Sequence, residues 1–580
     1  MKSNNIEQIR HSLAHLLGAA VLELYPGSKL AIGPSIDDGF YYDIDVEGKI
    51  SDADLPRIET EMRKILKTWD AFEEIKETAA SAKKHYVGNP YKIELIEELS
   101  AKKEKITSYK SGRFVDLCRG GHVESAKSIK PDSFKLSRVA GAYWRGDEKN
   151  KQLTRIYGYA FEDKKSLEAH ITQIEEAKKR DHKKLGPELD LFAFSDLVGP
   201  GLPLWTPKGT LLRNILDDFV WGLRKKHGYQ QVDIPHITKK DLYEKSGHWE
   251  KFQDELFKIT TREGHLFAMK PMNCPHHTQI YARKPHSYKE LPQRYANTTK
   301  DYRDEQTGEL SGLSRVRAFT QDDAHVFCRM SQAKDEFLIV WDIVHEFYKS
   351  FGFELQVRLS RHDPKHMEKY LGDEKKWQSA EKVLSDIIKD KKVKALDGLG
   401  EAAFYGPKLD FLAKDSIGRE WQVATIQLDM NMPERFDLSC INEKGEKERI
   451  VMIHAAIMGS IERFLSITIE HYAGAFPLWL SPVQAAILPI SDNQNKWADR
   501  VSKELTANGV RTEINSNNET LGKKIRQAEL QKIPYLLIVG EKEEKAETVA
   551  VRQRGVGDLG QMKINKFIEK IADEINKKTR

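Results

Sequence analysis

Two interruptions of the hydrophobic pattern divide this chain into blocks that cannot share a single core. A helical pattern with a basic end runs over residues 166–184 and stops at Gly186-Pro187, and a second break falls at Ser481-Pro482. Domains average roughly 150 residues, so 580 residues suffice for three or four of them. We therefore predict an N-terminal domain over 1–165, a linker helix over 166–185, a middle domain over 186–480 and a C-terminal domain over 481–580.

The middle and C-terminal blocks have different patterns. After Ser481-Pro482 the chain alternates strand and helix, with predicted elements at 485–490, 496–507, 510–514, 521–530 and 535–539. This alternation predicts a small α/β domain. The middle block mixes long helices with aromatic and β-branched strands at no regular βαβ spacing, which favours a largely antiparallel sheet with helices. The predicted fold class is a multidomain α+β protein.

Charge and cysteine content exclude several classes of protein. Lys and Arg number 93 against 88 Asp and Glu, a formal net charge of +5, so a basic surface can exist only as local patches. Cys118, Cys274, Cys328 and Cys440 are too few for a disulfide framework. No apolar signal segment follows Met1, and no run approaches the roughly 20 apolar residues that span a bilayer. We expect a cytoplasmic protein with no membrane partner.

The familiar nucleotide-binding loops do not explain the middle block. Gly398, Gly400 and Ala403 fit a G-x-G-x-x-A pattern, but Gly406-Pro407 follows at once and prevents the helix that a dinucleotide site needs. No P-loop pattern is present. A protein of this sequence that uses ATP must bind it through a different apparatus.

Three segments of the middle block supply such an apparatus. Residues 302–325 concentrate cations, acids and an aromatic between two strand-like stretches, which in isolation indicate only a solvated hairpin. Residues 459–464 begin an apolar helix in which Gly459 permits close backbone approach and Arg463 projects from the first turns. With Pro235, which ends the strand after a helix at 211–227, these segments resemble the three ordered motifs of class II aminoacyl-tRNA synthetases.

The wording of the motifs is more specific. KPMNCP at 270–275, RVRAFTQDDAH at 315–325 and AFYGPKLD at 403–410 closely resemble the threonyl-tRNA synthetase family, and the resemblance covers essentially the whole chain. It implies a class II antiparallel-sheet core, an N-terminal α/β editing domain and a C-terminal α/β anticodon-binding domain. It also implies a homodimer that joins threonine to threonine tRNA with ATP. Bacterial members carry a further small domain before the first helix of this sequence, and we expect this chain to lack it.

The resemblance assigns roles within the ATP and threonine sites. Activation is an attack of the threonine carboxylate on the α-phosphorus of ATP, so charge neutralisation and positioning dominate its catalysis. Implied ATP ligands are Arg303 on the α-phosphate, Glu305 on the adenine amino group, Phe319 and Arg463 on the two adenine faces, and Arg315, with Mg²⁺ accompanying ATP. His248 and Lys408 match positions that the family uses around the transfer step. Implied threonine contacts are Met272, Gln321, Asp323, Tyr405 and Gln427.

A metal site follows from the same resemblance. Cys274, His325 and His454 are suitable zinc ligands, and three protein ligands leave one position open for a substrate. Their separations say nothing by themselves, because a lone cysteine or histidine is usually a satisfied core residue. The family uses one zinc ion per subunit to bind the amino and hydroxyl groups of threonine, which rejects valine. Serine keeps the hydroxyl and loses only a methyl group, worth about 10- to 200-fold, so a second hydrolytic sieve is expected.

The N-terminal block contains a candidate for that sieve. A helix over 6–24 places an apolar stripe on one face and His11 and His15 together on the other, where small neighbours would leave both rings accessible. Asp116, Cys118 and His122 form a second cluster. The alternatives are an ordinary polar face or a zinc site, as in the related alanine enzyme. The family resemblance implies metal-independent hydrolysis of seryl-tRNA.

Other functions fit less of the sequence. A proline or serine class II enzyme would share the ATP motifs but lack the Cys274, His325 and His454 set. A regulatory RNA-binding relative would be expected to lose Arg303 or Arg463, and both are present. A free-standing zinc deacylase would not need the middle block.

In the C-terminal block, basic residues that could contact tRNA are Lys523, Lys524, Arg526, Arg552 and Arg554.

Overall fold

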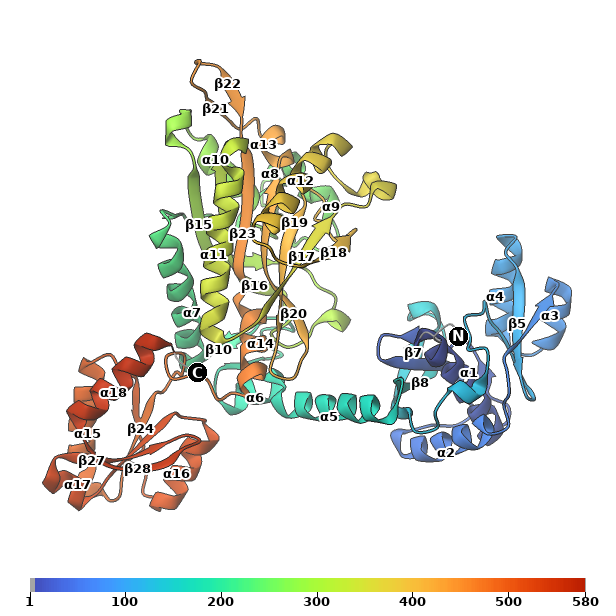
Figure 1. The fold of residues 1–580 in the computed structure, drawn as a ribbon, viewed down its shortest axis with the longest axis horizontal. Helices are drawn as coiled ribbons and strands as arrows, with labels where there is room; N and C mark the ends of the chain where they lie inside the picture. The colour runs from blue at the N-terminus through green and yellow to red at the C-terminus, as the bar shows by residue number, and fades with distance from the viewer. Residues whose placement is uncertain (1–5, 579–580) are drawn as a thin grey trace. The chain divides into compact units, whose positions relative to one another are not determined.

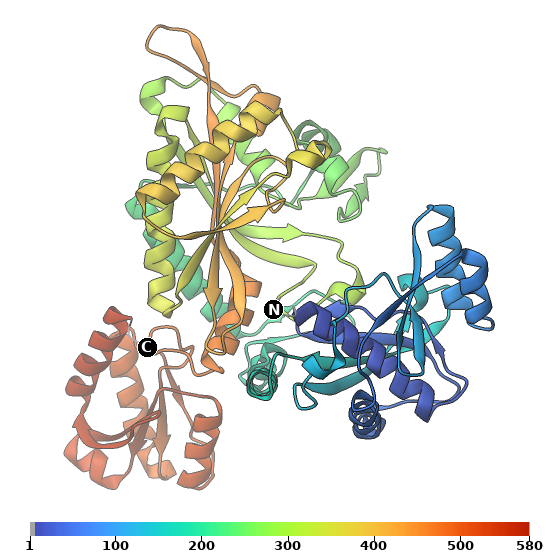
Figure 2. The ribbon, with the colours of Figure 1, turned by 45° about the vertical axis from the view of Figure 1, so that its right-hand side comes forward.

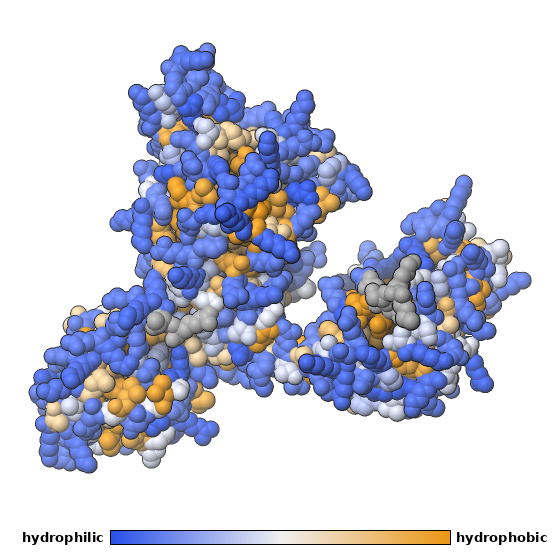
Figure 3. Space-filling view, viewed as in Figure 1, coloured by the Kyte–Doolittle hydropathy of each residue, from blue (hydrophilic) through white to orange (hydrophobic). Residues whose placement is uncertain are grey.

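The computed structural model describes residues 6–578, which divide into two compact units that meet at residues 176 and 177 (Figure 1). The first unit contains the predicted N-terminal domain, and the second contains the predicted middle and C-terminal domains. Hydrophilic side chains cover most of the visible face, and apolar residues form scattered patches on it (Figure 3). None of the helices among residues 6–578 is long and apolar enough to cross a membrane.

The first unit is built on two antiparallel sheets. The larger has the strand order β1-β3-β8-β7, with β2 paired to β3, and the smaller is β4-β5-β6. The strands are β1 Lys29–Leu30, β2 Ser35–Ile36, β3 Gly39–Asp45, β4 Glu73–Glu77, β5 Ile106–Ser111, β6 Phe114–Leu117, β7 Phe134–Tyr143 and β8 Gln152–Ala160. The helices are α1 Ile6–Leu24, α2 Leu55–Leu66, α3 Ala79–His85 and α4 Pro90–Ala101.

Helix α1 has the bounds that the sequence predicts, but its burial differs from the prediction. The apolar stripe that includes Leu13 and Leu17 packs into the core of this unit. The opposite face is buried as well, because the segment after β6 covers it and the Val123 N–H donates to Ser12 Oγ at 3.1 Å. His15 is only 3% exposed, and its ring is reached through the cavity that it lines and not from an open helix face.

The predicted linker helix is two helices. Helix α5 spans Lys164–Arg180 and α6 spans His182–Glu188. Asp181 leaves the helical conformation, with φ −51° and ψ 120°, and its carboxylate caps α6 by accepting from the Lys183 N–H at 2.8 Å. Pro187, predicted to follow the helix, lies inside α6. The apolar periodicity continues across Asp181, so the sequence pattern does not reveal that the helix ends there and a new helix begins.

An eight-stranded sheet forms the centre of the second unit, in the order β11-β15-β16-β23-β20-β19-β17-β18 (Figures 1 and 2). The strands are β11 Gln230–Gln231, β15 Gln293–Tyr302, β16 Ala318–Cys328, β17 Leu355–Arg361, β18 Ala395–Leu399, β19 Lys408–Lys414, β20 Glu420–Asp429 and β23 Val451–Ser460. Neighbouring strands are antiparallel except for the outermost pair at each edge. The prediction of a largely antiparallel sheet is confirmed, and no helix follows Gly398 and Gly400 in residues 400–407.

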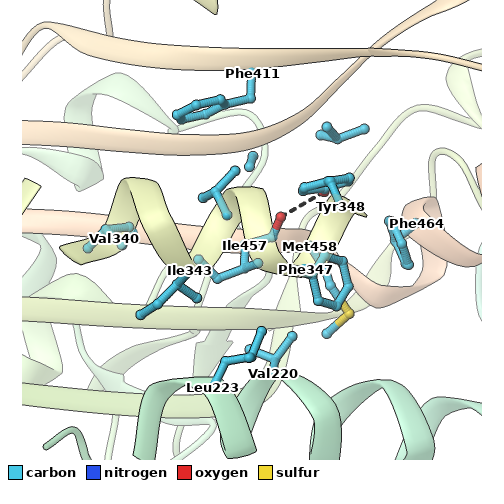
Figure 4. Packing of buried hydrophobic residues seen from close by; sticks show 14 of the residues in the cluster. Val220, Leu223, Val340, Ile343, Phe347, Tyr348, Phe411, Ile457, Met458 and Phe464 are labelled. Atoms are coloured by element: carbon cyan, nitrogen blue, oxygen red, sulfur yellow. Dashed lines mark hydrogen bonds between the residues drawn. The ribbon is translucent and has the colours of Figure 1, made fainter. Parts of the chain in front are cut away.

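Three helices cover this sheet and form the main core: α7 Pro207–Lys226, α11 Ala333–Phe351 and α14 Ile461–Tyr472. Aromatic residues of α11 and α14, among them Phe347 and Phe464, pack beside aliphatic residues of α7 (Figure 4). Tyr348, fully buried, donates its hydroxyl to the Ile457 carbonyl of β23 at 2.7 Å. Burial of apolar surface at roughly 25 cal/mol per Å² makes this cluster the chief stabiliser of the sheet that carries the site.

Smaller elements surround the sheet. The remaining strands before residue 480 are β9 Phe192–Ala193, β10 Leu204–Trp205, β12 Ile237–Lys239, β13 Lys258–Thr260, β14 Leu266–Met269, β21 Ser439–Ile441 and β22 Lys447–Arg449. The remaining helices there are α8 Lys240–Ser246, α9 His248–Lys251, α10 Cys274–Ala282, α12 Glu374–Asp390 and α13 Asn431–Arg435.

The last hundred residues form an α/β layer structure with the strand order β25-β24-β26-β27-β28. The strands are β24 Ala485–Pro489, β25 Thr512–Ile514, β26 Tyr535–Val539, β27 Thr548–Gln553 and β28 Gly557–Lys563, and the helices are α15 Asn495–Ala507, α16 Leu521–Leu530, α17 Glu541–Ala546 and α18 Ile564–Lys577. The predicted alternation through residue 539 is confirmed.

Two of the basic residues proposed to contact tRNA instead bind the backbone of this chain. Lys524 Nζ donates to the Pro489 carbonyl at 2.9 Å, and Arg554 donates to the Ala475 carbonyl at 3.1 Å.

Candidate active sites

Strand register brings the proposed zinc ligands together. His325 on β16 lies directly opposite His454 on β23, although 129 residues separate them in sequence. Cys274 joins them from the first turn of α10, and one ligand atom from each of the three residues lies within 4.8 Å of the others. Directly opposed residues in a sheet have Cβ atoms about 5 Å apart, however far apart they lie in sequence. The spacing of the ligands along the chain therefore gave no indication of the cluster.

The donor set fits a tetrahedral ion. The inward nitrogens, His325 Nε2 and His454 Nδ1, lie 3.0 Å apart, close to the roughly 3.3 Å expected for two imidazoles on one zinc ion. Each outward nitrogen has a partner: His454 Nε2 lies 3.0 Å from Asp429 Oδ2, and His325 Nδ1 lies 2.8 Å from His277 Nδ1. Outer partners of this kind orient metal-binding imidazoles. Sequence reasoning did not identify Asp429 and His277 as the outer partners of the two histidines. These contacts follow from the register of β20 and from the first turn of α10.

Burial controls the protonation of the cluster. It raises the pKa of Cys274 well above the ordinary value and lowers the pKa of His325 well below it. The imidazole is therefore neutral at pH 7, as a ligand must be. The thiol keeps its proton unless a cation takes its place, so metal binding at this site releases a proton.

A cavity of about 450 Å³ opens beside the cluster. Its lining includes all five predicted threonine contacts and also Arg303, Lys408 and Arg463: Met272, Cys274, Arg303, Gln321, Asp323, His325, Tyr405, Lys408, Gln427, His454 and Arg463. The structure therefore brings together residues that lie on β15–β16, β19, β20, β23 and α14. Of the other predicted residues, Phe319 lies under the Arg303 guanidinium, whose Cζ is 5.2 Å from the ring centroid.

Arg463 is a cation without a counter-charge. It lies in the first turn of α14, where its N–H donates to Ser460 Oγ at 3.2 Å. Burial lowers its pKa, and among the described residues no carboxylate lies within ion-pair distance of it. A guanidinium that lines a cavity and lacks an anion is ready to bind one supplied by a ligand.

The remaining predicted residues lie outside the cavity lining. Glu305 is 8% exposed and pairs with Arg315 at 2.7 Å, so these two residues brace the loop between β15 and β16. His248 is fully buried, with Nε2 3.7 Å from Cys274 Sγ and Nδ1 2.8 Å from Ser246 Oγ. Burial lowers the pKa of His248 to about 3, so its ring is neutral at pH 7.

The second site lies in the first unit and joins the two predicted N-terminal clusters. His11 Nε2 lies 3.0 Å from Cys118 Sγ, and Cys118 Sγ lies 3.3 Å from His122 Nε2. One ligand atom from each of His11, His15, Cys118 and His122 lies within 4.8 Å of the others, so this set could also hold a metal ion. A cavity of about 350 Å³ is lined by His11, His15, Asp116 and Cys118.

Asp116 lines the same cavity and is held by buried polar partners. Its carboxylate pairs with the buried Lys92 at 2.6 Å, accepts the Tyr42 hydroxyl, and lies 3.9 Å from His15 Nε2. Lys92 also lines the cavity. Sequence reasoning missed Lys92 and Tyr42, because a lysine in a helix and a tyrosine in a strand carry no local indication of burial.

Burial also decides the protonation of this site. It raises the pKa of Cys118 to about 11, so the thiol stays protonated at pH 7 and is a poor nucleophile. It lowers the pKa of His11, His15 and His122, so these imidazoles are neutral at pH 7 and have a free lone pair. The same burial makes each ring a weaker base than an exposed histidine, and the shift is larger for His15 and His122 than for His11.

Comparisons with known proteins match three parts of the chain to family models. Residues 106–157 match the model of the "Threonyl and Alanyl tRNA synthetase second additional domain", residues 257–472 match the "tRNA synthetase class II core domain (G, H, P, S and T)", and residues 484–574 match the "Anticodon binding domain". The threonine–tRNA ligase of Porphyromonas gingivalis is 51% identical over 98% of this chain and 87% of its own length. That of Acetivibrio thermocellus is 49% identical over 98% of this chain and 88% of its own.

Solved structures give the same result. A structure of the RNA binding domain of threonyl-tRNA synthetase from Cryptosporidium parvum has a TM-score of 0.65 at 35% identity, covering 68% of this chain and 98% of that chain. The prolyl-tRNA synthetase of Giardia lamblia has a TM-score of 0.55 at 17% identity, over 70% and 80% of the two chains, and shares the fold. The class II core, the editing domain and the 51% identity over 98% of this chain all indicate the same family. The chain therefore belongs to the threonine–tRNA ligase family, the class II aminoacyl-tRNA synthetases that join threonine to tRNA with ATP.

Proposed function

We propose that the cavity beside Cys274, His325 and His454 binds threonine and ATP side by side. The observation that carries this proposal is the meeting of that cluster with two arginines, Arg303 and Arg463, in one cavity. Arg303 would neutralise the α-phosphate during attack by the threonine carboxylate, and Mg²⁺ that accompanies ATP would supply further positive charge. Arg463 and Phe319 would hold the adenine ring from opposite faces.

ATP–pyrophosphate exchange across the amino acids tests this assignment. Threonine should give the strongest exchange, serine a weaker one and valine almost none. Valine has the shape of threonine but lacks the hydroxyl, so it would leave polar groups of the site unpaired, a loss worth about 10⁴-fold or more. Equal exchange with valine and threonine would contradict the proposed threonine site.

We propose that one Zn²⁺ ion per subunit is held by Cys274, His325 and His454. When bound, the ion would accept the amino and hydroxyl groups of threonine as ligands. The chain's own residues complete the pocket: the Asp323 carboxylate, 7% exposed, would accept a hydrogen bond from the amino group, and the Gln427 amide is fixed because its nitrogen donates to the Gly406 carbonyl at 2.8 Å. Met272, Gln321 and Tyr405 complete the proposed threonine contacts.

For the transfer step we propose His248 and Lys408. Lys408 Nζ lies 3.0 Å from the buried Asp410 carboxylate, which fixes a cation at the cavity edge. His248 is fully buried and neutral, with Nε2 3.7 Å from Cys274 Sγ, so it would act by positioning Cys274 and not by touching the tRNA. Glu305 and Arg315 would contact adenine and phosphate from the loop between β15 and β16.

We propose that the site of the first unit hydrolyses seryl-tRNA without a metal ion, with a neutral imidazole of His11, His15 or His122 as general base. Hydrolysis should then continue unchanged in a chelator. Asp116 would fix the positions of Lys92 and Tyr42 beside the cavity.

The proposed domains are an editing domain over 1–165, a linker over 166–185, a catalytic domain over 186–480 and an anticodon-binding domain over 481–580.

The pH dependence of editing provides a prediction. An imidazole accepts a proton only when neutral, and burial lowers the pKa of these three histidines, so they stay neutral further into acid. Enzyme-catalysed hydrolysis of seryl-tRNA should therefore change by less than about twofold between pH 8 and pH 6. A histidine of ordinary pKa, about 6.5, would lose about three quarters of its base form over that range. A fourfold decrease at pH 6 would contradict the assignment.

Binding of the tRNA anticodon is predicted to depend on exposed cations of the C-terminal block. Lys523 and Arg526 are exposed on α16, whereas Lys524 and Arg554 bind backbone carbonyls and should be left intact. Replacing Lys523 and Arg526 with Ala should raise the KM for tRNA several-fold and leave threonine-dependent pyrophosphate exchange unchanged. Substitution of the exposed Lys566 on α18 is the control. An unchanged KM for tRNA would contradict this placement.

We also propose a cytoplasmic homodimer. All four cysteines are free, as in proteins of reducing compartments. Apolar side chains near β9 and β10 are exposed, with Leu197 fully accessible and Val198 and Leu204 each 44% exposed, and a second copy would cover them. Leu197→Asp should shift the sedimentation mass from a dimer to the 66.6 kDa chain, whereas Val87→Asp, at an exposed position of the first unit, should not. A wild-type monomer would contradict the dimer.

A further inference from the structure

A buried histidine outside both sites connects two elements that carry proposed ATP ligands. His182 is the first residue of α6 and is 4% exposed. Its Nδ1 lies 2.6 Å from Glu470 Oε1 in the last turns of α14. Its Nε2 accepts a hydrogen bond from the Leu313 N–H at 3.0 Å, in the loop between β15 and β16. One imidazole therefore contacts both α14, the helix whose first turn carries Arg463, and the loop that carries Glu305.

The two contacts fix the protonation of the ring. A backbone N–H can only donate, so His182 Nε2 must be the unprotonated acceptor. The ring proton is then on Nδ1, which donates a hydrogen bond to the Glu470 carboxylate. Glu470 is itself held, because the His182 N–H donates to it at 3.2 Å and Arg419 pairs with its other oxygen at 2.6 Å. Asp181, His182 and Glu470 also lie at metal-ligand spacing, but both ring nitrogens of His182 are already engaged.

The loop approaches α6 closely at this point. A Cβ atom on Gly312 would lie 2.3 Å from His182 Nε2, and Gly312 has a φ of +53°, so both space and backbone conformation favour glycine. Leu313 is fully buried in the same core cluster as Leu185 and Leu189 of the α6 region. The tip of the loop is thus fastened to α6 by one hydrogen bond and one buried side chain.

The base of the loop is fastened separately. The Arg303 N–H donates to the Arg317 carbonyl at 2.9 Å, and Glu305 pairs with Arg315 at 2.7 Å. Between this base and the tip at Leu313, the placement of Arg315 depends on both anchors. Loss of the tip contact would leave the sheet and the base of the loop intact while loosening the segment between them, from which Arg315 projects.

We infer that His182 is a positioning residue for ATP: its Nε2 holds the 303–317 loop, and its Nδ1 ties that loop to helix α14. This inference rests on the proposed function, which assigns Glu305, Arg315 and Arg463 to the nucleotide. His182 directly follows the break at Asp181, so the first residue of α6 is the one that fixes the ATP loop.

Two substitutions separate the contacts of the ring. Asparagine places an amide near the position of Nδ1, so His182→Asn can still donate to Glu470 but cannot reach Leu313. Glutamine places its amide near the position of Nε2, so His182→Gln can accept from Leu313 but loses Glu470. His182→Asn should raise the KM for ATP in pyrophosphate exchange about tenfold, the equivalent of one hydrogen bond, with the KM for threonine changed less than twofold. His182→Gln should keep the KM for ATP within about threefold of wild type.

A second pair tests the same contact from the loop. Gly312→Ala forces a methyl group against His182 and should also raise the KM for ATP. Gly308→Ala lies in the same loop with open space around its Cβ and should leave it unchanged. If His182→Asn and His182→Gln change the KM for ATP equally, or if Gly308→Ala matches Gly312→Ala, the positioning role is overturned.

Hydrogen exchange gives a readout that does not depend on activity. In the substrate-free enzyme, peptides within 303–317 should exchange faster in His182→Asn than in His182→Gln, since only the former frees the Leu313 N–H. Equal exchange in both would overturn the loop anchor. Absence of threonine-dependent pyrophosphate exchange in the wild type would instead contradict the proposed function, while the exchange experiment still tests the anchor.

Discussion

Replacing Cys274 with Ala should lower threonine-dependent pyrophosphate exchange by about 10³-fold or more and remove the bound zinc. The reason is that two imidazoles alone hold zinc weakly, and without the ion the amino and hydroxyl groups of threonine lose their common partner. The substitution removes a small buried side chain next to a cavity of about 450 Å³, so the sheet should stay folded. Metal content per chain, measured together with exchange, links the two losses.

Cys328→Ala is the matched control. Cys328 is also a fully buried thiol and lies on the same strand as His325, three residues away, but it packs into the apolar core and takes no part in the cluster. Its substitution should cost some stability and leave zinc content and threonine exchange unchanged. Full threonine activity in metal-stripped wild-type enzyme would refute the zinc proposal, whatever the behaviour of the two variants.

The wild type and Cys274→Ala should also differ in selectivity. With the cluster intact, threonine should exceed valine by about 10⁴-fold and serine by only about 10- to 200-fold. Without it, the three amino acids should approach one another at a low rate, because shape alone discriminates weakly. Retained discrimination against valine in Cys274→Ala would place the selection in the side chains of Tyr405 and Gln427 instead.

Local periodicity predicted a large part of the fold. The bounds of α1, the C-terminal alternation through residue 539 and the antiparallel pairing of β15 with β16 all follow from short-range pattern. The break at Asp181 did not, because a cap residue interrupts the backbone and leaves the apolar spacing of α5 and α6 continuous. Burial of the second face of α1 was also missed, since it depends on the segment after β6, more than 90 residues away.

The sites divide in the same way. The zinc cluster was named only through resemblance to a family, because strand register, not spacing, sets His325 opposite His454. The outer partners Asp429 and His277 and the buried Lys92 could not be named at all, since each acts through a contact between elements distant in sequence. Such contacts depend on the assembled fold. Gln321 and Asp323, which share one strand, were also named only through that resemblance, and both line the cavity.

Editing and synthesis should be separable by substitution, because their residues lie in different compact units. His15→Ala should lower hydrolysis of seryl-tRNA by about 10²- to 10⁴-fold, the range for loss of a general acid or base. Threonine-dependent exchange should be unchanged, since Arg303, Arg463 and the zinc ligands all lie after residue 176. His15 is buried, but it lines a cavity of about 350 Å³, so water can occupy the space that the ring leaves.

The control and the reciprocal variant complete this experiment. His85→Ala removes an exposed histidine of the same unit, paired with Glu77 and outside the cavity, and should edit normally. Arg303→Ala should lose about 10² to 10³ in activation, because a developing phosphate charge loses its cation, yet it should hydrolyse supplied seryl-tRNA at the wild-type rate. In His15→Ala supplied with serine, seryl-tRNA should accumulate, because the catalytic cavity rejects the missing methyl group weakly. If His15→Ala instead clears seryl-tRNA as fast as the parent, the cavity of the first unit is not the editing site.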